Sequence, residues 1–561
     1  MVVQTESYVK VADLAKVQET GCLTVQANGH TLVLFAYGDA VYAVDNRCPH
    51  MGFPLDKGTV KDGILTCHWH HARFDLASGG TFDLFADDVP AFPADVQDGM
   101  VWVDLTPRED PRERQRVRLR IGLERNISLV IAKAVLVLTD GDGDPVEPFR
   151  VGLEFGATYR QAGWGQGLTI LTLLMNMVPR LDPEDRPRAL YHGLSALANE
   201  VDGNPPRFGV TPLPHVATDI ATLKKWFRQF IEVRDDEGAE RCIISALRAG
   251  ATPAQMADML FAAVTDHRYI QIGHPADFTN KAFAALDLAG WDYAETVLTS
   301  LARGYAMADR MEESNAWRNP IDLIALLGGA FEQIAGAVDA GRNRRGQRND
   351  RVDLVNTLLD DDPQASVDAL LDALRGGATE VELASSVSYA AALRIARFHT
   401  SNEFGDWDTA LHTFTFSNAV EQGLRRAPSN ELLRGVFDAA MSVYLDRFLN
   451  IPAARLPHAN GKAPDTAIGE LPELLNNQQQ VNEAGQLVAQ YLYGGGSPER
   501  IMAMLGKLLL REDRNFHTLQ TVEAAFRQFD FCRAVTQRVQ KGINARLRII
   551  VQQRVNQIDT I

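Results

Sequence analysis

Two pairs of cysteine and histidine in the first part of the sequence could bind metal. The first pair is Cys48 and His50, with one residue between them, and the second is Cys67 and His70, with two residues between them. Sixteen residues separate the two pairs. Thiolate sulfur and imidazole nitrogen are common ligands of zinc and iron in proteins. The residue types and their spacing therefore predict a metal centre built from two short loops.

Zinc is one occupant that these four side chains could hold, because structural zinc sites often use two cysteines and two histidines around one ion. The usual zinc arms pair like ligands, whereas here each loop offers one thiol and one imidazole. Two mixed loops suit a [2Fe-2S] centre in which cysteines hold one iron and histidines hold the other. The spacing therefore favours an iron–sulfur centre over zinc.

The pattern Cys-x-His, sixteen residues, Cys-x-x-His resembles that of Rieske iron–sulfur domains, and the resemblance covers about residues 1–106. It implies that Cys48 and Cys67 hold the iron that stays ferric. It also implies that His50 and His70 hold the iron that takes the electron. The cofactor expected from the resemblance is a [2Fe-2S] cluster.

Four positions differ from the respiratory-chain type of Rieske protein. Phe53 and Trp69 stand where that type has a pair of disulfide-forming cysteines. Ala72 and Phe74 stand where it has hydroxyl groups that donate hydrogen bonds to the cluster. Fewer donors stabilise the reduced cluster less, so we expect a low reduction potential, as in the ferredoxins that serve ring-hydroxylating oxygenases.

The sequence changes character after this region. Residues 1–106 contain short β-type segments separated by glycine and aspartate turns, and a charged, proline-broken linker follows at about 107–117. Apolar residues then recur with helical period through the rest of the chain. We expect a multidomain fold, with a small all-β Rieske domain followed by a large all-α domain, residues 107–561.

The helical part contains an internal duplication, at about 240–300 and 367–440. The segment 246–252 recurs at 373–379, and in both copies a glycine ends one helix and a threonine can cap the next. Further downstream, a second matching segment places one histidine in each copy. Two other segments match more weakly, and each of them also contains a histidine. We therefore expect four repeated helical hairpins, each with a histidine near the start of its second helix: His192, His274, His412 and His517.

Histidines on facing helices, together with carboxylates, can hold iron inside a helical bundle. We hypothesise a second metal site in this domain. The competing interpretation is structural, since a histidine at a helix start can simply cap or hydrogen-bond a neighbouring hairpin. The helical repeats also faintly resemble questin-oxidase-like proteins. The candidate ligands of the second site are the four histidines with Asp266, Glu200, Glu403 and Glu512.

The composition of the chain limits the classes of molecule that it is expected to bind. The 561-residue chain has a formal net charge of −16, which disfavours nucleic acid and anionic membrane surfaces. The first residues lack the basic and apolar stretches of a secretory signal, and the five cysteines suggest no disulfide framework. We therefore expect a cytoplasmic protein. No nucleotide-binding motif is present, so electrons are expected from a separate reductase.

Two functions follow from these patterns. The leading hypothesis is a cytoplasmic Rieske oxidoreductase, an oxygenase that passes electrons from the cluster to a His/carboxylate metal site and acts on a small organic substrate. The alternative is a non-catalytic electron-transfer protein whose helical half is a docking scaffold. Neither the substrate nor the oligomeric state follows from the sequence.

Overall fold

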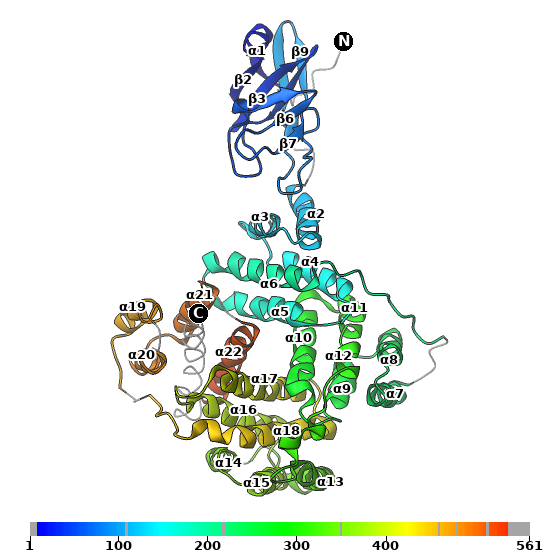
Figure 1. The fold of residues 1–561 in the computed structure, drawn as a ribbon, viewed down its shortest axis with the longest axis vertical. Coiled ribbons are helices and arrows are strands. Elements are labelled where there is room, and N and C mark those ends of the chain that lie inside the picture. Colours follow the sequence, from blue (N-terminus) through cyan, green and yellow to red (C-terminus); the bar gives the residue numbers. More distant parts are fainter. Residues whose placement is uncertain are drawn as a thin grey trace. The chain divides into compact units, whose positions relative to one another are not determined.

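The computed structural model describes residues 8–106, 110–214, 219–347, 351–457, 460–477, 480–511 and 515–536. Contacts divide the chain into two compact units, Met1–Gly143 and Asp144–Ile561. All strands of the described residues lie in the first unit, and the second is helical (Figure 1). The predicted fold class, a small β domain followed by a large α domain, is confirmed.

The strands of the first unit form three antiparallel sheets. Their orders are β1-β10-β9, β2-β3-β4-β8 and β5-β6-β7. The strands are β1 (Tyr8–Asp13), β2 (Cys22–Ala27), β3 (His30–Tyr37), β4 (Ala40–Asp45), β5 (Thr59–Lys61), β6 (Ile64–Thr66), β7 (Arg73–Asp75), β8 (Ala91–Phe92), β9 (Ala94–Gln97) and β10 (Met100–Asp104), and the short helix α1 (Leu14–Thr20) follows β1.

Two-residue turns set the register of three hairpins. Residues 28–29 join β2 to β3, residues 62–63 join β5 to β6, and residues 98–99 join β9 to β10. Each turn is Asn-Gly or Asp-Gly, and both of its residues have positive φ, between 46° and 84°. This conformation matches the twist of antiparallel strands, and Asn, Asp and Gly adopt it at low cost. The local sequence therefore determines these hairpins.

The first unit extends beyond the β domain that the sequence predicts. Helices α2 (Pro111–Glu124) and α3 (Ser128–Thr139) pack against each other and belong to it. Arg118 of α2 donates to the Ala86 carbonyl at 2.7 Å and pairs with Asp87 at 3.1 Å. The first compact unit therefore ends at Gly143 and includes α2 and α3. Residues 111–117 of the predicted linker are helical, and residues 107–109 lie outside the described part.

The second unit is built from helices joined by short loops (Figure 1). They are α4 (Val146–Tyr159), α5 (Gln166–Met177), α6 (Arg186–Val201), α7 (Ile220–Glu232), α8 (Asp236–Arg248), α9 (Pro253–Val264), α10 (His274–Ala289), α11 (Ala294–Thr299), α12 (Ala302–Ala306), α13 (Leu323–Gly341), α14 (Arg351–Leu358), α15 (Pro363–Arg375), α16 (Glu380–Ala396), α17 (Phe404–Arg426), α18 (Asn430–Leu445), α19 (Pro464–Leu474), α20 (Val481–Tyr493), α21 (Pro498–Arg511) and α22 (Phe516–Thr536).

Four helices form the centre of this unit. Helix α10 packs against α5 and α17, and α22 packs against the same two helices, which closes a ring of four (Figure 1). Buried polar side chains such as Asn280, Asn418 and Gln528 lie on these helices, together with the usual apolar ones. The middle of the bundle is therefore a polar interior enclosed by protein.

The duplicated segment has the same caps in both copies. Thr252 caps α9 and Thr379 caps α16, each through a capping box with the residue three positions later. Gly250 and Gly377 precede these caps with φ of +82° and +97°. Positive φ favours glycine, so this residue ends the preceding helix without strain. Each copy of the repeat therefore forms the same connection between two helices, in which a glycine ends the first helix and a threonine caps the second.

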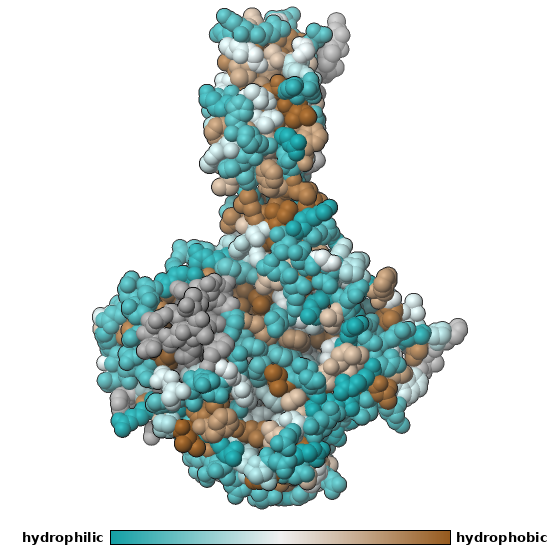
Figure 2. Space-filling view, viewed as in Figure 1, coloured by the Kyte–Doolittle hydropathy of each residue, from teal (hydrophilic) through white to brown (hydrophobic). Residues whose placement is uncertain are grey.

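One helical stretch among the described residues, Leu323–Arg344, is long and apolar enough to cross a membrane by length and composition. Its α13 part buries Leu327, Ala330 and Ile334 and packs against α15 and α18. The core helix of a soluble protein passes the same test, so this stretch does not by itself establish a span. The face seen in Figure 2 is largely hydrophilic over the helical unit.

Candidate functional site

The two predicted ligand loops have the same backbone design. They span residues 48–53 and 67–72. In each loop the cysteine N–H donates to the carbonyl five residues later, and the N–H four residues later donates back to the cysteine carbonyl, at 2.8 to 3.0 Å. Gly52 and His71 occupy that fourth position with φ of +84° and +60°. The two matching loops therefore present their cysteines in equivalent ways, and the histidine follows two residues later in the first loop and three residues later in the second.

The four predicted ligands lie together at these loops. Cys48 and Cys67 are buried, and the ring centroids of His50 and His70 are 4.7 Å apart. Burial, together with the adjacent Cys67 thiol, raises the pKa of the Cys48 thiol to about 11. The Nδ1 atom of His50 is buried and has no hydrogen-bond partner among the described residues. Two buried free thiols and an unpartnered imidazole nitrogen fit an iron–sulfur cluster.

A lysine of the following helical hairpin reaches the first ligand loop. The Lys133 ammonium group, on α3, donates to the carbonyl of Pro49 at 2.5 Å and to the carbonyl of His50. Burial lowers the pKa of Lys133, while the nearby Asp87 and Cys48 raise it. This partly buried amine is therefore a positive charge in direct contact with that loop. It can influence the electron affinity of a bound cluster.

We expect Lys133→Met to lower the midpoint potential of the cluster, because a nearby positive charge stabilises the reduced, more negative state. Lys133→Arg keeps the charge and serves as the matched control. Redox titration followed by electron paramagnetic resonance of the reduced cluster measures the shift. A methionine variant with an intact cluster and an unchanged midpoint would contradict this role for Lys133.

Three histidines that the repeats predict converge in the second unit. His274 begins α10, His412 lies in α17 and His517 lies at the start of α22, so each comes from a different helix of the central ring. Their ligand nitrogens all lie within 4.8 Å of one another. The Nε2 atoms of His274 and His412 are 3.2 Å apart. Three nitrogen donors around one point could hold a metal ion.

The state of the three imidazoles suits metal binding. Burial, together with the neighbouring histidines, lowers the pKa of His274 to about 3 and that of His412 to about 4. The imidazoles are therefore neutral at pH 7. The Nδ1–H of His412 donates to the carbonyl of Asp408 at 2.5 Å, which leaves its Nε2 lone pair facing the cluster. A backbone partner on the other nitrogen is the usual support of a metal-bound histidine.

The backbone immediately before His274 has an unusual conformation. Tyr269, Gln271 and Ile272 have φ between 42° and 47°, and Gly273 has φ of 91°. Left-handed backbone costs about 1–2 kcal/mol per non-glycine residue, and a β-branched residue such as isoleucine rarely adopts it. A Cβ at Gly273 would lie 2.8 Å from the Phe416 side chain. Strain of this kind gathers at functional sites.

Buried ion pairs hold this turn, residues 269–273, in place. Arg268 pairs with Asp438 at 2.9 Å, and both side chains are almost fully buried. The Arg268 N–H donates to Glu312 at 2.9 Å, and the Gln271 N–H donates to the Asp309 carbonyl at 2.7 Å. These contacts compensate for the strained conformation. The turn therefore fixes the direction in which His274 enters the bundle.

Three predicted ligands of the second site have other partners. His192 lies on α6, which packs against α4 and α5, and it is not part of the three-histidine cluster. Glu200 accepts from the N–H groups of Gln166 and Gly167, at the start of α5, at 2.9 and 2.7 Å. Asp266 pairs with arginines of α7 and α18 at 2.6 and 3.1 Å. These residues stabilise helix ends and helix contacts.

The two remaining predicted carboxylates are Glu403 and Glu512. Glu403 caps α17 in a capping box with Asp406, and Glu512 lies outside the described residues. The sequence interpretation missed Asp408, whose charge opposes the burial-driven lowering of the His517 pKa. Burial in turn raises the pKa of Asp408. Its position four residues before His412, on the same face of α17, is the signal that could have revealed it.

Charged groups continue from the three histidines into the bundle. Gln520 donates to Asp277, and Lys281 pairs with Glu523 at 2.6 Å and lies 3.8 Å from Asp277. The side chains of Asp277, Lys281 and Glu523 are at most 3% exposed. Burial raises the pKa of Asp277. These groups can hold a proton beside the histidine cluster, and they account for part of the polar interior.

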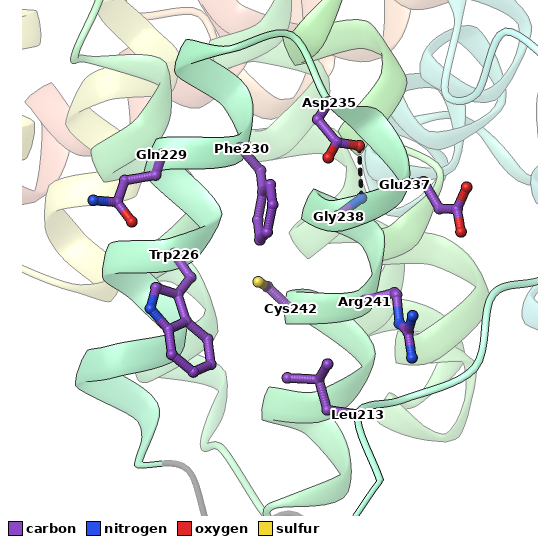
Figure 3. A pocket seen from close by; sticks show the side chains of 9 residues that line it. All are labelled: Leu213, Trp226, Gln229, Phe230, Asp235, Glu237, Gly238, Arg241 and Cys242. Carbon is purple, nitrogen blue, oxygen red and sulfur yellow. Dashed lines mark hydrogen bonds between the residues drawn. The ribbon is translucent and has the colours of Figure 1, made fainter.

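A cavity of about 720 Å³ lies between α7 and α8, and its lining includes none of the predicted metal ligands. Figure 3 shows Trp226 and Phe230 of α7 facing Cys242 of α8 across it, while the Arg241 side chain extends from the other side of α8. Burial raises the pKa of the Cys242 thiol to about 12, so this thiol is not a nucleophile at pH 7. The lining residues include no set of metal ligands. We assign this cavity no chemistry.

Comparison with known proteins decides the nature of the first site. Residues 7–93 match the family model of the Rieske [2Fe-2S] domain. The chain belongs to the Rieske family through this domain. The Rieske domain binds a [2Fe-2S] cluster, and the loops that carry Cys48, His50, Cys67 and His70 lie within the matched range. The assignment of those four residues as its ligands stays a prediction.

The relatives of the Rieske domain include small ferredoxin subunits and larger proteins in which only one part matches. The ferredoxin subunit of an Escherichia coli 3-phenylpropionate/cinnamic acid dioxygenase is 32% identical over 82 residues, 14% of this chain and 76% of that subunit. Human apoptosis-inducing factor 3 is 24% identical over 172 residues, 30% of this chain and 25% of that protein. The chain thus spans about a quarter of the length of the latter.

A solved ferredoxin structure also aligns with a part of the chain. The ferredoxin of carbazole 1,9a-dioxygenase from Nocardioides aromaticivorans IC177 is 26% identical, with a TM-score of 0.17. The match covers 18% of this chain and all of that ferredoxin. The faint resemblance of the helical repeats to questin-oxidase-like proteins is not shown by these comparisons. The family model covers residues 7–93 only, so the function of the helical unit is inferred from its own residues.

Proposed function

We propose that the protein is a cytoplasmic Rieske oxidoreductase that passes electrons from its [2Fe-2S] cluster to a metal ion held by His274, His412 and His517. Iron is the metal we propose, and an oxygenation of a small organic substrate is the reaction. A separate reductase supplies the electrons, because the sequence has no nucleotide-binding motif. Dioxygen is the oxidant.

The observation that carries this proposal is the convergence of three neutral imidazoles in a chain that also has a Rieske domain. A Rieske cluster transfers electrons and needs an acceptor. Three nitrogen ligands leave coordination positions open, which a metal that binds oxygen or substrate requires. Three histidines also suit zinc, as in hydrolytic sites. The electron donor in the same chain favours a redox metal over zinc.

The chain's own residues have definite tasks in this proposal. The Asp408 carbonyl holds the His412 ring in one tautomer and one orientation. The turn at residues 269–273 fixes the position of His274. Burial raises the pKa of Asp277, which favours its protonated form near the histidines, and a reaction that consumes oxygen takes up protons. The surrounding helices shield His412, which is only 8% exposed, while His274 and His517 are partly buried.

The alternative is that the protein transfers electrons without catalysis and that its helical unit is a docking scaffold. The similarity of the Rieske domain to a ferredoxin subunit supports this view. In that case the three histidines would have a structural role. Their mutual contacts would have to stabilise the bundle, although burying several basic groups without a ligand usually destabilises a protein.

Metal analysis separates the two functions. We expect purified protein, reconstituted anaerobically with ferrous iron and sulfide, to hold about one more metal ion per chain than the cluster accounts for. The excess is seen as iron above acid-labile sulfide. Equal iron and sulfide, with no other metal in a substantial fraction of chains, would instead establish the carrier. Elemental analysis of the same sample identifies zinc if it is the ion present.

A further inference from the structure

A cavity of about 310 Å³ opens beside the three-histidine cluster. His274 lines it, and this residue also belongs to the cluster. The other lining residues come from the segment before α5, the start of α10 and the region of α12. One imidazole therefore borders both the proposed metal position and an open space. Small-molecule sites have volumes of about 300–1,000 Å³, so this space is at the small end.

Aromatic and apolar side chains form much of the cavity wall, among them Trp164, Phe278, Leu301 and Tyr305. The Trp164 indole N–H donates to Thr169 at 2.8 Å, and the Tyr305 hydroxyl is paired with Thr279. Both polar groups thus have partners within the protein. What these rings offer to the cavity is apolar surface, which favours a flat, apolar ligand.

Among the described residues, Arg160 is the one charged side chain that lines the cavity, and its charge is neutralised by an ion pair. The Arg160 guanidinium pairs with Glu200 at 3.2 Å and donates to the Gly163 carbonyl at 2.9 Å. An anionic ligand would compete with Glu200 for this guanidinium. A neutral ligand avoids that competition. The electrostatics of the wall therefore favour a neutral molecule over a carboxylate or phosphate.

The cavity also includes part of the strained turn. Gln271 lines it with φ of +45°, and its side chain accepts from the Asp309 N–H at 2.8 Å. The His274 ring stacks on Phe278 with centroids 5.4 Å apart. Strain at the cavity wall, next to a cluster of neutral imidazoles, is a second and independent sign of a binding site.

We propose that this cavity binds the substrate, a neutral, planar aromatic molecule of one or two rings, next to the metal ion at His274, His412 and His517. The proposal rests on the proposed function for the metal, and on the cavity wall for the class of ligand. The partly exposed Phe278 ring holds the face of the molecule, and the buried Trp164 lies behind it in the cavity wall. The imidazole of His274 places it beside the metal.

Gly304 allows a test that leaves the histidines unchanged. It lines the cavity, and a Cβ at this position meets no described atom within 4 Å. Gly304→Phe therefore adds a ring to the cavity without a backbone clash. The matched control is Gly328→Phe on the exposed side of α13, where a Cβ also meets no described atom within 4 Å. A cooperative thermal unfolding transition in each variant is the control that both variants fold.

The probe is 4-fluorophenol, a small neutral aromatic whose binding is followed by fluorine NMR. We expect it to bind the wild type and Gly328→Phe alike, and Gly304→Phe at least about tenfold more weakly, a difference of about 1.4 kcal/mol. Loading the protein with cobalt(II), a paramagnetic stand-in for iron, should accelerate the fluorine relaxation of the bound probe. The acceleration should be absent in His412→Ala.

The outcomes separate this inference from the proposed function. Equal binding to the two phenylalanine variants, or no binding at millimolar probe, would overturn the cavity as an aromatic site. Probe binding that depends on Gly304, in protein that takes up no cobalt, would support the cavity and overturn the metal site. Cobalt that binds without changing the relaxation of the probe would overturn the placement of the ligand beside the metal.

Discussion

Replacement of Cys48 by serine is expected to reduce the [2Fe-2S] content to below about a tenth of the wild-type value, because a serine hydroxyl does not replace the thiolate ligand. Without metal, the pKa of Cys48 is raised to about 11 by burial, so iron must displace a proton from this thiol at pH 7. The measurement is iron and acid-labile sulfide per chain, with the electron paramagnetic resonance spectrum of the reduced protein.

The matched control is Cys22→Ser, which changes a cysteine of the same β domain that is not a predicted ligand. We expect it to keep the cluster. The far-ultraviolet circular dichroism of Cys48→Ser should retain its helical signal, since the helices of Asp144–Ile561 form a separate compact unit. Retention of a full cluster in Cys48→Ser, or one tetrahedral zinc in the wild type, would show that the ligand assignment is wrong.

Replacement of His412 by alanine is expected to weaken metal binding at the helical site by at least about tenfold, because it removes one of three nitrogen ligands. The Rieske cluster should remain, since its predicted ligands lie in the other unit. Equilibrium dialysis of ferrous iron or cobalt(II) against the protein measures the loss. Sulfide content, measured on the same sample, reports the cluster independently.

His192→Ala is the matched control, because it removes a partly buried histidine of the same helical unit that lies outside the cluster. It should leave metal binding unchanged. A structural role for the cluster makes a different prediction for His412→Ala. The melting temperature would then fall while metal content stayed at the wild-type level, and that combination would rule out the metal site.

Local sequence patterns determined several features of this protein. The Asn-Gly and Asp-Gly pairs fix the β hairpins because few residues tolerate positive φ. Thr252 and Thr379 mark helix starts because their hydroxyls accept from the first unpaired N–H groups. The cysteine and histidine spacing indicated the Rieske domain, since two short loops must each carry their ligands within a few residues.

Only the tertiary structure decided which distant side chains meet. The repeats predicted a histidine on each hairpin, but α5 occupies the fourth place in the central ring, and His192 on α6 lies outside it. Carboxylates could not be assigned from sequence because each has nearby competing partners. Glu200 meets the N–H groups at the start of α5, and Asp266 meets arginines of α7 and α18.

The conformation of the turn before His274 could not be predicted from the local sequence. The residues Gln271 and Ile272 give no local reason to adopt positive φ, and isoleucine disfavours it. Their conformation is imposed by contacts with residues far along the chain, such as Asp309 for Gln271 and Asp438 for the neighbouring Arg268. The sequence by itself determined short-range turns, caps and ligand spacing. The packing of the bundle decided the direction of His274, because only long-range contacts can compensate for local strain.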